Sequence, residues 1–483
     1  MVLGELLLSV GIKVKREFYS LPVKGITEDS RRVNPGYLFF AYKGTRLDGN
    51  LFIGEAVKRG AVAVITDSKE SLKRWGSFLP VFLVKEPRKA FSLLSAKFYG
   101  NPERELCLIG ITGTNGKTTT AFLTQSALLN LGESAGYVGT LGYRIGSSKL
   151  VPLERTTPSP AELFAILKDF VRKGCRFAVI EVSSHALELE RVFGITFTSS
   201  AFTNLTPEHL DFHKDTYSYF LSKEKLFFNS ESSLFNLDDS WGKALFGLRG
   251  LFKRVLSYGS SPFSDFRILS FKGGSLILSY LNRVYTVPTS LKGDFNAYNL
   301  ACSFALLVSL GFSPNAVSSS FREVKVPGRF EEVHKGVFVD YAHTPDALEK
   351  LLKSASSFCR GRLITVFGCG GDRDKSKRAP MGKIAYKYSD LVIITNDNPR
   401  NEEPESIISD ILSGIPNLDK VSVIPDRREA IFKALSLKGE EDLVVIAGKG
   451  HEDYQIVKGR REHFSDREVV SEFYKCKEAG RNS

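Results

Sequence analysis

The chain has 483 residues, more than one ordinary hydrophobic core organises, so roughly two to four domains are expected. Apolar residues make up 42% and charged residues 25%, which excludes a fibrous repeat and global disorder, and no apolar run reaches the ~20 residues of a membrane span. Lysine and arginine (66) exceed aspartate and glutamate (54), but the charges are interspersed, so anionic small molecules are favoured over nucleic acid as partners.

The N-terminal section indicates a small α/β domain. The stretch MVLGELLLSVGIKVKREF does not fit a secretory signal, because Glu5 interrupts its apolar run and no cleavage site follows, so we expect a cytoplasmic protein. From about residue 25 to 87, the β-like runs YLFFAYKG, AVAVIT and PVFLV alternate with turns and one helical stretch.

The next section predicts a parallel sheet with helices. It begins with the helical run KAFSLLSAKFYG and continues with the strand LCLIGIT, a glycine loop, and the helix TTTAFLTQSALLNLG, which Gly132 closes. Further strands are predicted at RFAVIEVSS and SSAFTNL. This alternation is typical of an α/β domain.

The glycine loop GTNGKTT has the features of a phosphate-binding loop. Glycines let backbone N–H groups approach phosphate oxygens, and the following helix N-terminus favours an anion. Lys117 would face the β and γ phosphates, and Thr118 would offer its hydroxyl to Mg²⁺. Ile111 stands where the strict pattern has glycine, so the loop is a shortened variant. The nucleotide-binding residues predicted here are Gly113, Thr114, Asn115, Gly116, Lys117, Thr118 and Thr119.

Polar groups that could serve a metal follow the next strands. Glu181 ends the run FAVIE, as the metal-binding acid of a nucleotide-hydrolysing domain would. The segment TNLTPEHLDFH clusters His209, Asp211 and His213, although such a group on a loop is also common as a surface or capping feature. Two lysines, at 223 and 225, follow in a helical stretch, where salt bridges are their ordinary role.

Near KVPGRFEEV, residues 325–333, the pattern restarts. The runs GVFVDYA, RLITVFG, SDLVIIT and DLVVIAG each precede a polar loop, and the first three lead towards helices. We interpret them as a second doubly wound sheet, whose loops beyond the strand C-termini carry function.

Ten blocks occur in the order found in the Mur ligases of bacterial cell-wall synthesis, and the chain resembles that family over nearly its whole length. They are GTNGKTT, EVSSHAL, TNLTPEHLDFH, SKEKLFF, GDFNAYNLA, VPGRFE, DYAHTPDAL, FGCGGDRDKSKRAPMG, DNPR and AGKGHE. The resemblance implies an α/β protein of three domains: an N-terminal UDP-substrate-binding domain (1–87), a central P-loop ATPase-type domain (88–327) and a C-terminal Rossmann-like, amino-acid-binding domain (328–483).

The resemblance also implies an ATP-dependent ligase of peptidoglycan precursor synthesis. ATP would phosphorylate the D-glutamate γ-carboxylate of UDP-N-acetylmuramoyl-L-Ala-D-Glu, and the amine of meso-diaminopimelate would attack the acyl phosphate. A carboxylate needs this activation because its own leaving group would be oxide. The enzyme is expected to be monomeric, without nucleic-acid or membrane partners.

By the family pattern, two Mg²⁺ ions serve the reaction. Thr118 and Glu181 would hold the first, while His209 and a carbamylated Lys223 would serve the second; Lys117 completes the catalytic set. Lys223 is preferred over Lys225 because the family has lysine, two residues, then Leu-Phe. The nucleotide contacts would be completed by Asn296 and Arg329.

The UDP-sugar dipeptide would contact residues of the first two sections. These are Glu28, Ser30, Thr45, Arg46, Leu47, Arg155, Thr156, Thr157, Ser183 and Arg191. Two positions depart from the family pattern. Arg155 stands in place of asparagine and Leu189 in place of glutamine, so the polar contacts at these positions are expected to differ.

The last section would select the amino acid. The segment DNPR alone is typical of a turn, but in the family context Arg400 would pair with the distal carboxylate of diaminopimelate, supported by Arg373. The glutamate of AGKGHE would meet an ammonium group. The predicted contacts are Arg373, Asp397, Asn398, Pro399, Arg400, Gly448 and Glu452.

Three alternatives stay open from the sequence. An L-lysine-adding muramoyl ligase shares the chemistry, but DNPR argues against it. A folate polyglutamate ligase shares the central architecture without needing the N-terminal DSR block. A nucleotide-gated transport ATPase would need neither the paired metal residues nor the C-terminal pocket.

Overall fold

The computed structural model describes residues 1–45 and 47–479. It separates into two compact units. The first comprises residues 1–205, 215–257 and 306–312, and the second comprises 206–214, 258–305 and the chain from Ser313 onward. The three-domain division at residues 87/88 and 327/328 stays a prediction.

The N-terminal sheet is parallel, in the order β1-β2-β3-β4. Its strands are β1 (Gly25–Thr27), β2 (Tyr37–Ala41), β3 (Ala61–Thr66) and β4 (Val81–Leu83). The accompanying helices are α1 (Leu3–Leu8), α2 (Arg16–Tyr19), η1 (Ser30–Arg32), η2 (Gly49–Phe52), α3 (Ile53–Lys58), α4 (Lys69–Trp75) and α5 (Pro87–Phe98). The expectation of one helical stretch here was wrong, because α3 and α4 are each shorter than the window over which helical periodicity is readable.

Helix α5 contributes to the core of the N-terminal sheet. Phe91 and Leu94 are buried against Phe40 of β2 and Ile65 of β3. On its other side, the Ser92 hydroxyl donates to the carbonyl of Phe193 (2.8 Å). The helix therefore joins the N-terminal sheet to the segment after α8.

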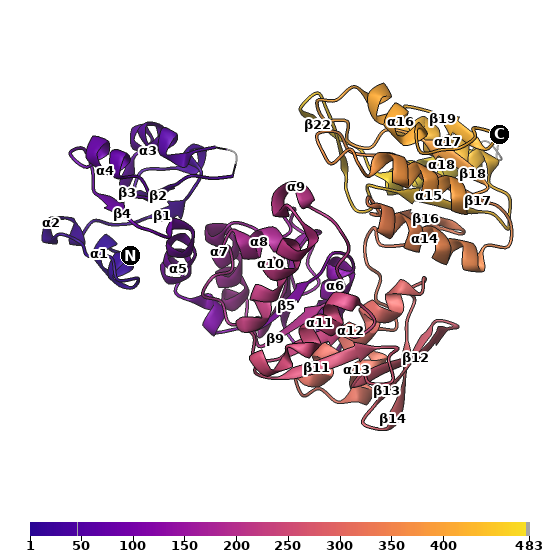
Figure 1. Ribbon diagram of the computed structural model, residues 1–483, viewed down its shortest axis with the longest axis horizontal. Helices are drawn as coiled ribbons and strands as arrows, with labels where there is room; N and C mark the ends of the chain where they lie inside the picture. Colours follow the sequence, from indigo (N-terminus) through magenta and orange to yellow (C-terminus); the bar gives the residue numbers. More distant parts are fainter. Residues whose placement is uncertain (46, 480–483) are drawn as a thin grey trace. The chain divides into compact units, whose positions relative to one another are not determined.

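The central sheet has the strand order β14-β13-β12-β11-β10-β9-β5-β8-β6-β7. Figure 1 labels its strands β5, β9, β11, β12, β13 and β14. Its strands are β5 (Cys107–Thr112), β6 (Ala135–Gly139), β7 (Gly142–Ile145), β8 (Phe177–Glu181), β9 (Ser199–Phe202), β10 (Ser233–Asn236), β11 (Val255–Gly259), β12 (Phe266–Lys272), β13 (Ser275–Tyr280) and β14 (Arg283–Pro288). The predicted strands β5, β8 and β9 are adjacent and parallel, as expected. The antiparallel strands β12, β13 and β14 were not anticipated from the sequence.

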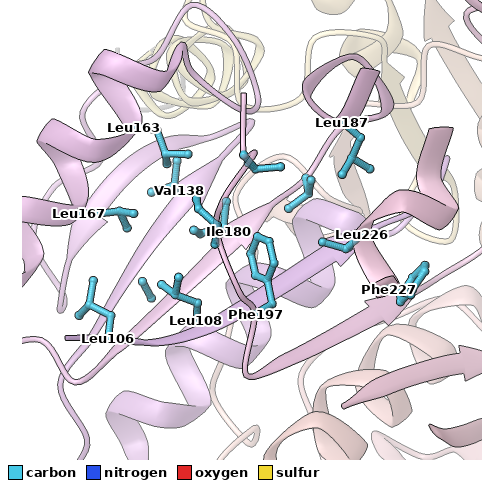
Figure 2. Close-up of a cluster of buried hydrophobic side chains, with 14 of the residues drawn as sticks. Leu106, Leu108, Val138, Leu163, Leu167, Ile180, Leu187, Phe197, Leu226 and Phe227 are labelled. Atoms are coloured by element: carbon cyan, nitrogen blue, oxygen red, sulfur yellow. The ribbon is translucent and has the colours of Figure 1, made fainter. Parts of the chain in front are cut away.

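The helices of this part alternate with the strands. They are η3 (Pro102–Arg104), α6 (Lys117–Asn130), α7 (Pro160–Arg172), α8 (Ser184–Glu188), α9 (Leu210–His213), α10 (Thr216–Phe228), α11 (Ser240–Gly247), η4 (Arg249–Leu251), α12 (Phe295–Ser309) and α13 (Pro314–Ser319). Figure 2 shows the hydrophobic core on one face of the sheet, where Leu163 and Leu167 of α7 meet Val138 and Ile180 of β6 and β8. The parallel pairing of β5 with β8 places the carboxyl ends of these two strands beside each other.

The C-terminal sheet has the order β15-β16-β20-β17-β18-β19. The four predicted strand runs are confirmed as β16 (Val337–Asp340), β17 (Leu363–Phe367), β18 (Leu391–Ile394) and β20 (Leu443–Ala447), all parallel. The sheet is completed by β15 (Glu331–His334) and β19 (Val421–Val423), and β21 (Tyr454–Val457) and β22 (Arg460–His463) form a separate hairpin. The helices are α14 (Pro345–Phe358), α15 (Arg378–Tyr388), α16 (Pro404–Leu412), α17 (Arg427–Leu437) and α18 (Asp466–Ala479).

No helix within residues 1–45 and 47–479 is long and apolar enough to cross a membrane. In both larger sheets, the polar segments singled out from the sequence follow the carboxyl ends of parallel strands. Those ends lie at one edge of a parallel sheet, which is where open α/β folds bind ligands.

Candidate active site

The glycine loop joins β5 to α6 in a conformation that needs glycine. Gly113 has φ 146° and Gly116 has φ 87°, values that residues with a Cβ rarely adopt. A Cβ at position 113 would lie 1.9 Å from Oγ1 of Thr203. The loop therefore lies against the end of β9 as closely as its backbone permits.

Hydrogen bonds hold the loop from both sides. Lys117 Nζ donates to the carbonyls of Gly113 (2.9 Å) and Thr114 (2.8 Å). Thr203 Oγ1 donates to the carbonyl of Asn115 (2.6 Å), and the Asn115 N–H donates to Oδ1 of Asn204 (3.0 Å). Thr203 and Asn204 belong to the TNLTPEHLDFH block, but sequence reasoning assigned them no role.

Glu181 is a fully buried carboxylate at the end of β8. Its Oε2 accepts from Thr118 Oγ1 (2.9 Å), and its Oε1 accepts from the Tyr137 hydroxyl (2.6 Å) and the Thr140 N–H (2.9 Å). The structure thus brings together Thr118 and Glu181, the predicted first Mg²⁺ pair. Tyr137 and Thr140 were missed, since only the parallel pairing of β6 with β8 places them there.

Lys223 of α10 also reaches the loop. Its side chain is buried, its Nζ donates to the carbonyl of Gly113 (2.8 Å), and it lies 4.4 Å from the ring centroid of Tyr219. Lys225, in contrast, is only half-buried, with 44% of its side-chain surface exposed, and pairs with Glu188 (2.7 Å). The two lysines that the sequence offered therefore have different surroundings, and Lys223 is the one beside the loop.

His209 belongs to the second compact unit. It precedes α9 with φ 57°, and its Nε2 lies 3.7 Å from Oε1 of Glu208. The same Glu208 oxygen lies 3.8 Å from Nε2 of His343. Burial lowers the pKa of His343 to about 4, so this ring is neutral at pH 7.

Two further predicted residues of the second unit are candidates for nucleotide contacts. Asn296 is buried, and its Nδ2 donates to the carbonyl of Lys292 (2.7 Å). The guanidinium of Arg329 lies 4.5 Å from the ring centroid of Tyr341. Both side chains are fixed by their own unit.

In the first unit, several residues predicted for the UDP-sugar dipeptide are connected to Glu181. Thr157 Oγ1 donates to the Glu181 carbonyl (2.7 Å) and accepts from the Ser183 N–H (3.0 Å). Arg191 donates to the Thr157 carbonyl (2.9 Å), and burial lowers the pKa of Arg191 to about 10. Thr156 shares a hydrogen bond with Thr140 (3.0 Å). A substrate held here would adjoin the Glu181 carboxylate.

The remaining predicted contacts lie around the N-terminal sheet. Glu28 accepts a hydrogen bond from Tyr42, and Arg155 lies 4.0 Å from Oε1 of Glu28, so this departure from the family pattern faces an acid. Ser30 Oγ donates to Glu55 (2.8 Å). Thr45 and Leu47 are exposed, Leu189 is half-buried after α8, and Arg46 lies outside the described residues.

In the second unit, the DNPR segment follows β18 and meets the AGKGHE loop. Arg400 donates to the carbonyl of Gly371 (2.7 Å), and Asn398 Nδ2 donates to Oε2 of Glu452 (2.9 Å). A Cβ at Gly448 would lie 2.6 Å from Oδ2 of Asp397, so the two loops need glycine where they approach. A guanidinium and a carboxylate are thereby held near the same sheet edge.

The other predicted residues of this site are less constrained. The Pro399 carbonyl accepts the N–H of Glu402 (3.1 Å), and Arg373 is exposed on the loop after β17. Sequence reasoning missed Lys449, which is fully buried and contacts both Asn398 (3.2 Å) and Glu452 (3.1 Å). Lys449 is the lysine of the AGKGHE block, and this position was the sequence signal that could have identified it.

Comparison with domain families gives three matches. Residues 22–102 match the Mur ligase family catalytic domain, residues 111–307 the Mur ligase middle domain, and residues 328–450 the Mur ligase glutamate ligase domain.

Curated relatives match over nearly the full length. A UDP-N-acetylmuramoyl-L-alanyl-D-glutamate–2,6-diaminopimelate ligase of Aquifex aeolicus is 47% identical over 459 residues, which cover 93% of each chain. The ligase of the same name from Clostridium perfringens is 41% identical and covers 97% of this chain and 99% of its own.

Solved structures show the same architecture. A UDP-N-acetylmuramoyl-L-alanyl-D-glutamate–2,6-diaminopimelate ligase superposes with a TM-score of 0.70 at 29% identity, covering 99% of this chain and 100% of that one. The MurF ligase of Thermotoga maritima in complex with ADP has a TM-score of 0.63 at 21% identity, covering 97% and 100%, and shows the likeness of fold.

Proposed function

The chain belongs to the Mur ligase family, and from this premise we propose that it adds meso-2,6-diaminopimelate to the D-glutamate γ-carboxylate of UDP-N-acetylmuramoyl-L-Ala-D-Glu. Its enzyme class is that of ligases forming an amide bond with consumption of ATP. The reaction belongs to peptidoglycan precursor synthesis, and we assign it to the cytoplasm and to a monomer.

The observation that supports this acceptor is the Arg400 side chain at the end of β18, beside the loop that carries Glu452. Diaminopimelate differs from lysine by a distal carboxylate, which a guanidinium can pair bidentately. Lysine would leave Arg400 desolvated without its partner, a penalty of roughly 2 to 5 kcal/mol. We therefore favour meso-diaminopimelate over L-lysine.

The P-loop residues account for activation of the carboxylate. Backbone N–H groups of the loop and the Lys117 ammonium would bind the phosphates of ATP, so that the γ-phosphate reaches the glutamate carboxylate. The resulting acyl phosphate expels phosphate when the amine attacks. Neutralising charge matters here because the nucleotide, the acceptor and the UDP group are all anionic.

The donor set fits Mg²⁺. Thr118 and Glu181 supply a hydroxyl and carboxylate oxygens 2.9 Å apart, and hard oxygen ligands are those that Mg²⁺ prefers. Among the described residues no group of three or more His, Cys, Asp or Glu side chains forms a metal site by itself, so phosphate oxygens and water would complete the shell. When bound, Mg²⁺ would stabilise negative charge on the phosphates. We assign a second ion to His209 and Lys223.

Lys223 fits a metal only after modification, because an ammonium repels cations. After the ammonium loses one proton, the Nζ lone pair adds to CO₂, which forms an Nζ–C bond, breaks one C–O π bond and releases a second proton; an anionic carbamate with oxygen donors is left. Burial beside the Gly113 carbonyl supports this assignment.

Replacing Lys223 tests the carbamate. Lys223→Ala should reduce ADP formation at least about a hundredfold, and high bicarbonate should not restore it, since no amine remains to carry the group. Lys225→Ala is the matched control and should stay near wild-type activity, because the half-exposed Lys225 side chain pairs with Glu188 instead of the Gly113 carbonyl. Activity in Lys223→Ala close to that of the control would contradict the assignment.

The function itself is tested by mixing ATP, UDP-N-acetylmuramoyl-L-Ala-D-Glu and either meso-diaminopimelate or L-lysine, and following ADP and tripeptide. Stoichiometric tripeptide with meso-diaminopimelate is expected. ADP release without an amide product would exclude the ligase function, and equal use of L-lysine would exclude the specificity.

A further inference from the structure

Lys449 is a fully buried lysine between the two loops of the amino-acid pocket, and no step of the proposed reaction uses it. Its Nζ donates to Oδ1 of Asn398 (3.2 Å) and to Oε2 of Glu452 (3.1 Å). It also lies 5.4 Å from the ring centroid of Tyr454. The ammonium is therefore surrounded by residues of the pocket.

The contacts close a triangle of hydrogen bonds. Asn398 Nδ2 donates to the same Oε2 of Glu452 (2.9 Å), and the Ile456 N–H donates to Oδ1 of Asn398 (2.9 Å). The other carboxylate oxygen, Oε1, accepts a longer hydrogen bond from the Tyr454 hydroxyl (3.3 Å). Glu452 is thus held through Oε2, and Oε1 is the more weakly engaged oxygen.

Stability alone does not account for this lysine. Burying an ammonium carries a large desolvation cost, and apolar residues of similar volume commonly replace buried ion pairs without loss of stability. A methionine would fill the same space. The charge is better explained by the geometry it imposes on Asn398 and Glu452.

We propose that Lys449 is a positioning residue of the amino-acid pocket. The Lys449 ammonium donates one hydrogen bond to Oε2 of Glu452 and another to Asn398, and so fixes both side chains. Glu452 then presents its other oxygen, Oε1, to the ammonium group of the incoming amino acid. This proposal rests on the proposed function, because Glu452 is assigned there to the acceptor amino acid.

The test compares Lys449→Met with wild type, and Lys433→Met serves as control because Lys433 is an exposed lysine of α17 in the same unit. In Lys449→Met, KM for meso-diaminopimelate should rise at least about tenfold, because one partner of a buried charge pair is lost. KM for ATP and for the UDP-dipeptide should stay within about twofold of wild type. A general defect in folding would lower the apparent kcat through loss of active enzyme and would not raise one KM selectively.

A double-mutant cycle tests whether Lys449 acts on the amino acid through Glu452. If Lys449 acts through Glu452, then Lys449→Met combined with Glu452→Gln should be no worse than Glu452→Gln alone. Additive losses, or an unchanged or lower KM for meso-diaminopimelate in Lys449→Met, would overturn the proposal while leaving the function intact. A wild-type enzyme that accepts no amino acid would overturn both.

Discussion

Buried polar side chains, each satisfied by a neighbour, define the candidate site at the scale of single residues. Glu181 accepts hydrogen bonds from a threonine, a tyrosine and a backbone N–H, all neutral donors. Arg400 donates to backbone carbonyls instead of an acid, which leaves its charge for a ligand carboxylate. Buried groups of this kind are costly to leave unpaired, so single substitutions should have large and specific effects.

Glu181→Gln tests the metal-binding role. The change keeps the shape of the side chain but removes the charge, so kcat should fall at least about a hundredfold. Tyr137→Phe removes one neutral hydrogen bond to the same carboxylate (2.6 Å), worth about 1 kcal/mol, and should cost no more than about tenfold. The rate of ADP release, measured as a function of Mg²⁺ concentration, distinguishes the two variants. Equal activities of the two variants would argue against a metal at Glu181.

Arg400→Ala tests the selection of the acceptor. Without the guanidinium, the distal carboxylate of meso-diaminopimelate has no partner. The loss of roughly 2 to 5 kcal/mol should lower kcat/KM for meso-diaminopimelate by about thirtyfold or more. The weak use of L-lysine, which has no distal carboxylate, should be unchanged. Arg428→Ala, an exposed arginine paired with Glu472, should behave as wild type. Tripeptide formation with each amino acid is the measurement. Similar losses for both amino acids would mean that Arg400 does not recognise the distal carboxylate.

At the scale of elements, loops are held in strained conformations by neighbouring strands. Arg400 has φ 56°, and the hairpin β21–β22 holds it by two backbone bonds: Arg400 N–H to Ile456 (2.9 Å) and Lys458 N–H to Arg400 (2.6 Å). Gln455 adds a bond to the Asp397 carbonyl (2.6 Å). The hairpin therefore maintains the conformation of the DNPR segment, which is unfavourable for arginine in isolation.

Gly113→Ala tests the turn between β5 and α6. The new Cβ would meet Thr203 Oγ1 at 1.9 Å, and φ 146° is unfavourable for alanine, so the loop must shift at a cost of about 1 to 3 kcal/mol. ATP affinity, measured by titration calorimetry, should fall at least tenfold, by about 1.4 kcal/mol or more.

Gly132→Ala is the control, at the other end of α6. It also has a positive φ, 84°, but a Cβ there meets nothing within 4 Å. It should cost stability without altering ATP affinity. Normal affinity in Gly113→Ala would show that the nucleotide does not depend on this turn.

At the scale of the whole molecule, the chain forms two compact units made of different segments. We therefore expect the protein to unfold in more than one transition, and not as a single two-state system. The second unit contains carboxylates whose charge is stabilised by arginine. Hydrogen bonds from Arg378 lower the pKa of Glu402 to about 2. For Asp442, burial raises the pKa, but hydrogen bonds from Arg362 and from the Gly439 N–H, together with the Arg362 charge, outweigh it and lower the pKa to about 2.

These shifts predict acid sensitivity of the second unit. Because the folded pKa values are lower than the unfolded ones, the stabilisation is present above about pH 4.5 and is lost as the pH falls towards 2. Calorimetric Tm of this unit should therefore drop between pH 5 and pH 3. Glu402→Gln should lower Tm at pH 7 and flatten this dependence, whereas exposed Glu405→Gln should not. A pH profile unchanged by Glu402→Gln would refute the assignment.

Local sequence patterns were enough to identify the family, the parallel strands β5, β8 and β9, and the polar segments that follow the parallel strands. This was possible because glycine loops, strand-ending acids and DNPR are local patterns that require particular residues in a fixed order. The roles of the individual site residues stay predictions.

Which side chains contact one another became clear from the three-dimensional packing alone. Tyr137 and Thr140 reach Glu181 because β6 pairs with β8, and Lys449 lies between Asn398 and Glu452 because β18 and β20 end at the same sheet edge. These side-chain arrangements depend on contacts between residues far apart in the chain, which no local spacing encodes. Strands β12, β13 and β14 escaped prediction for a different reason, because their turns at Gly273-Gly274 and Leu281-Asn282 are local signals that the strand assignment left out.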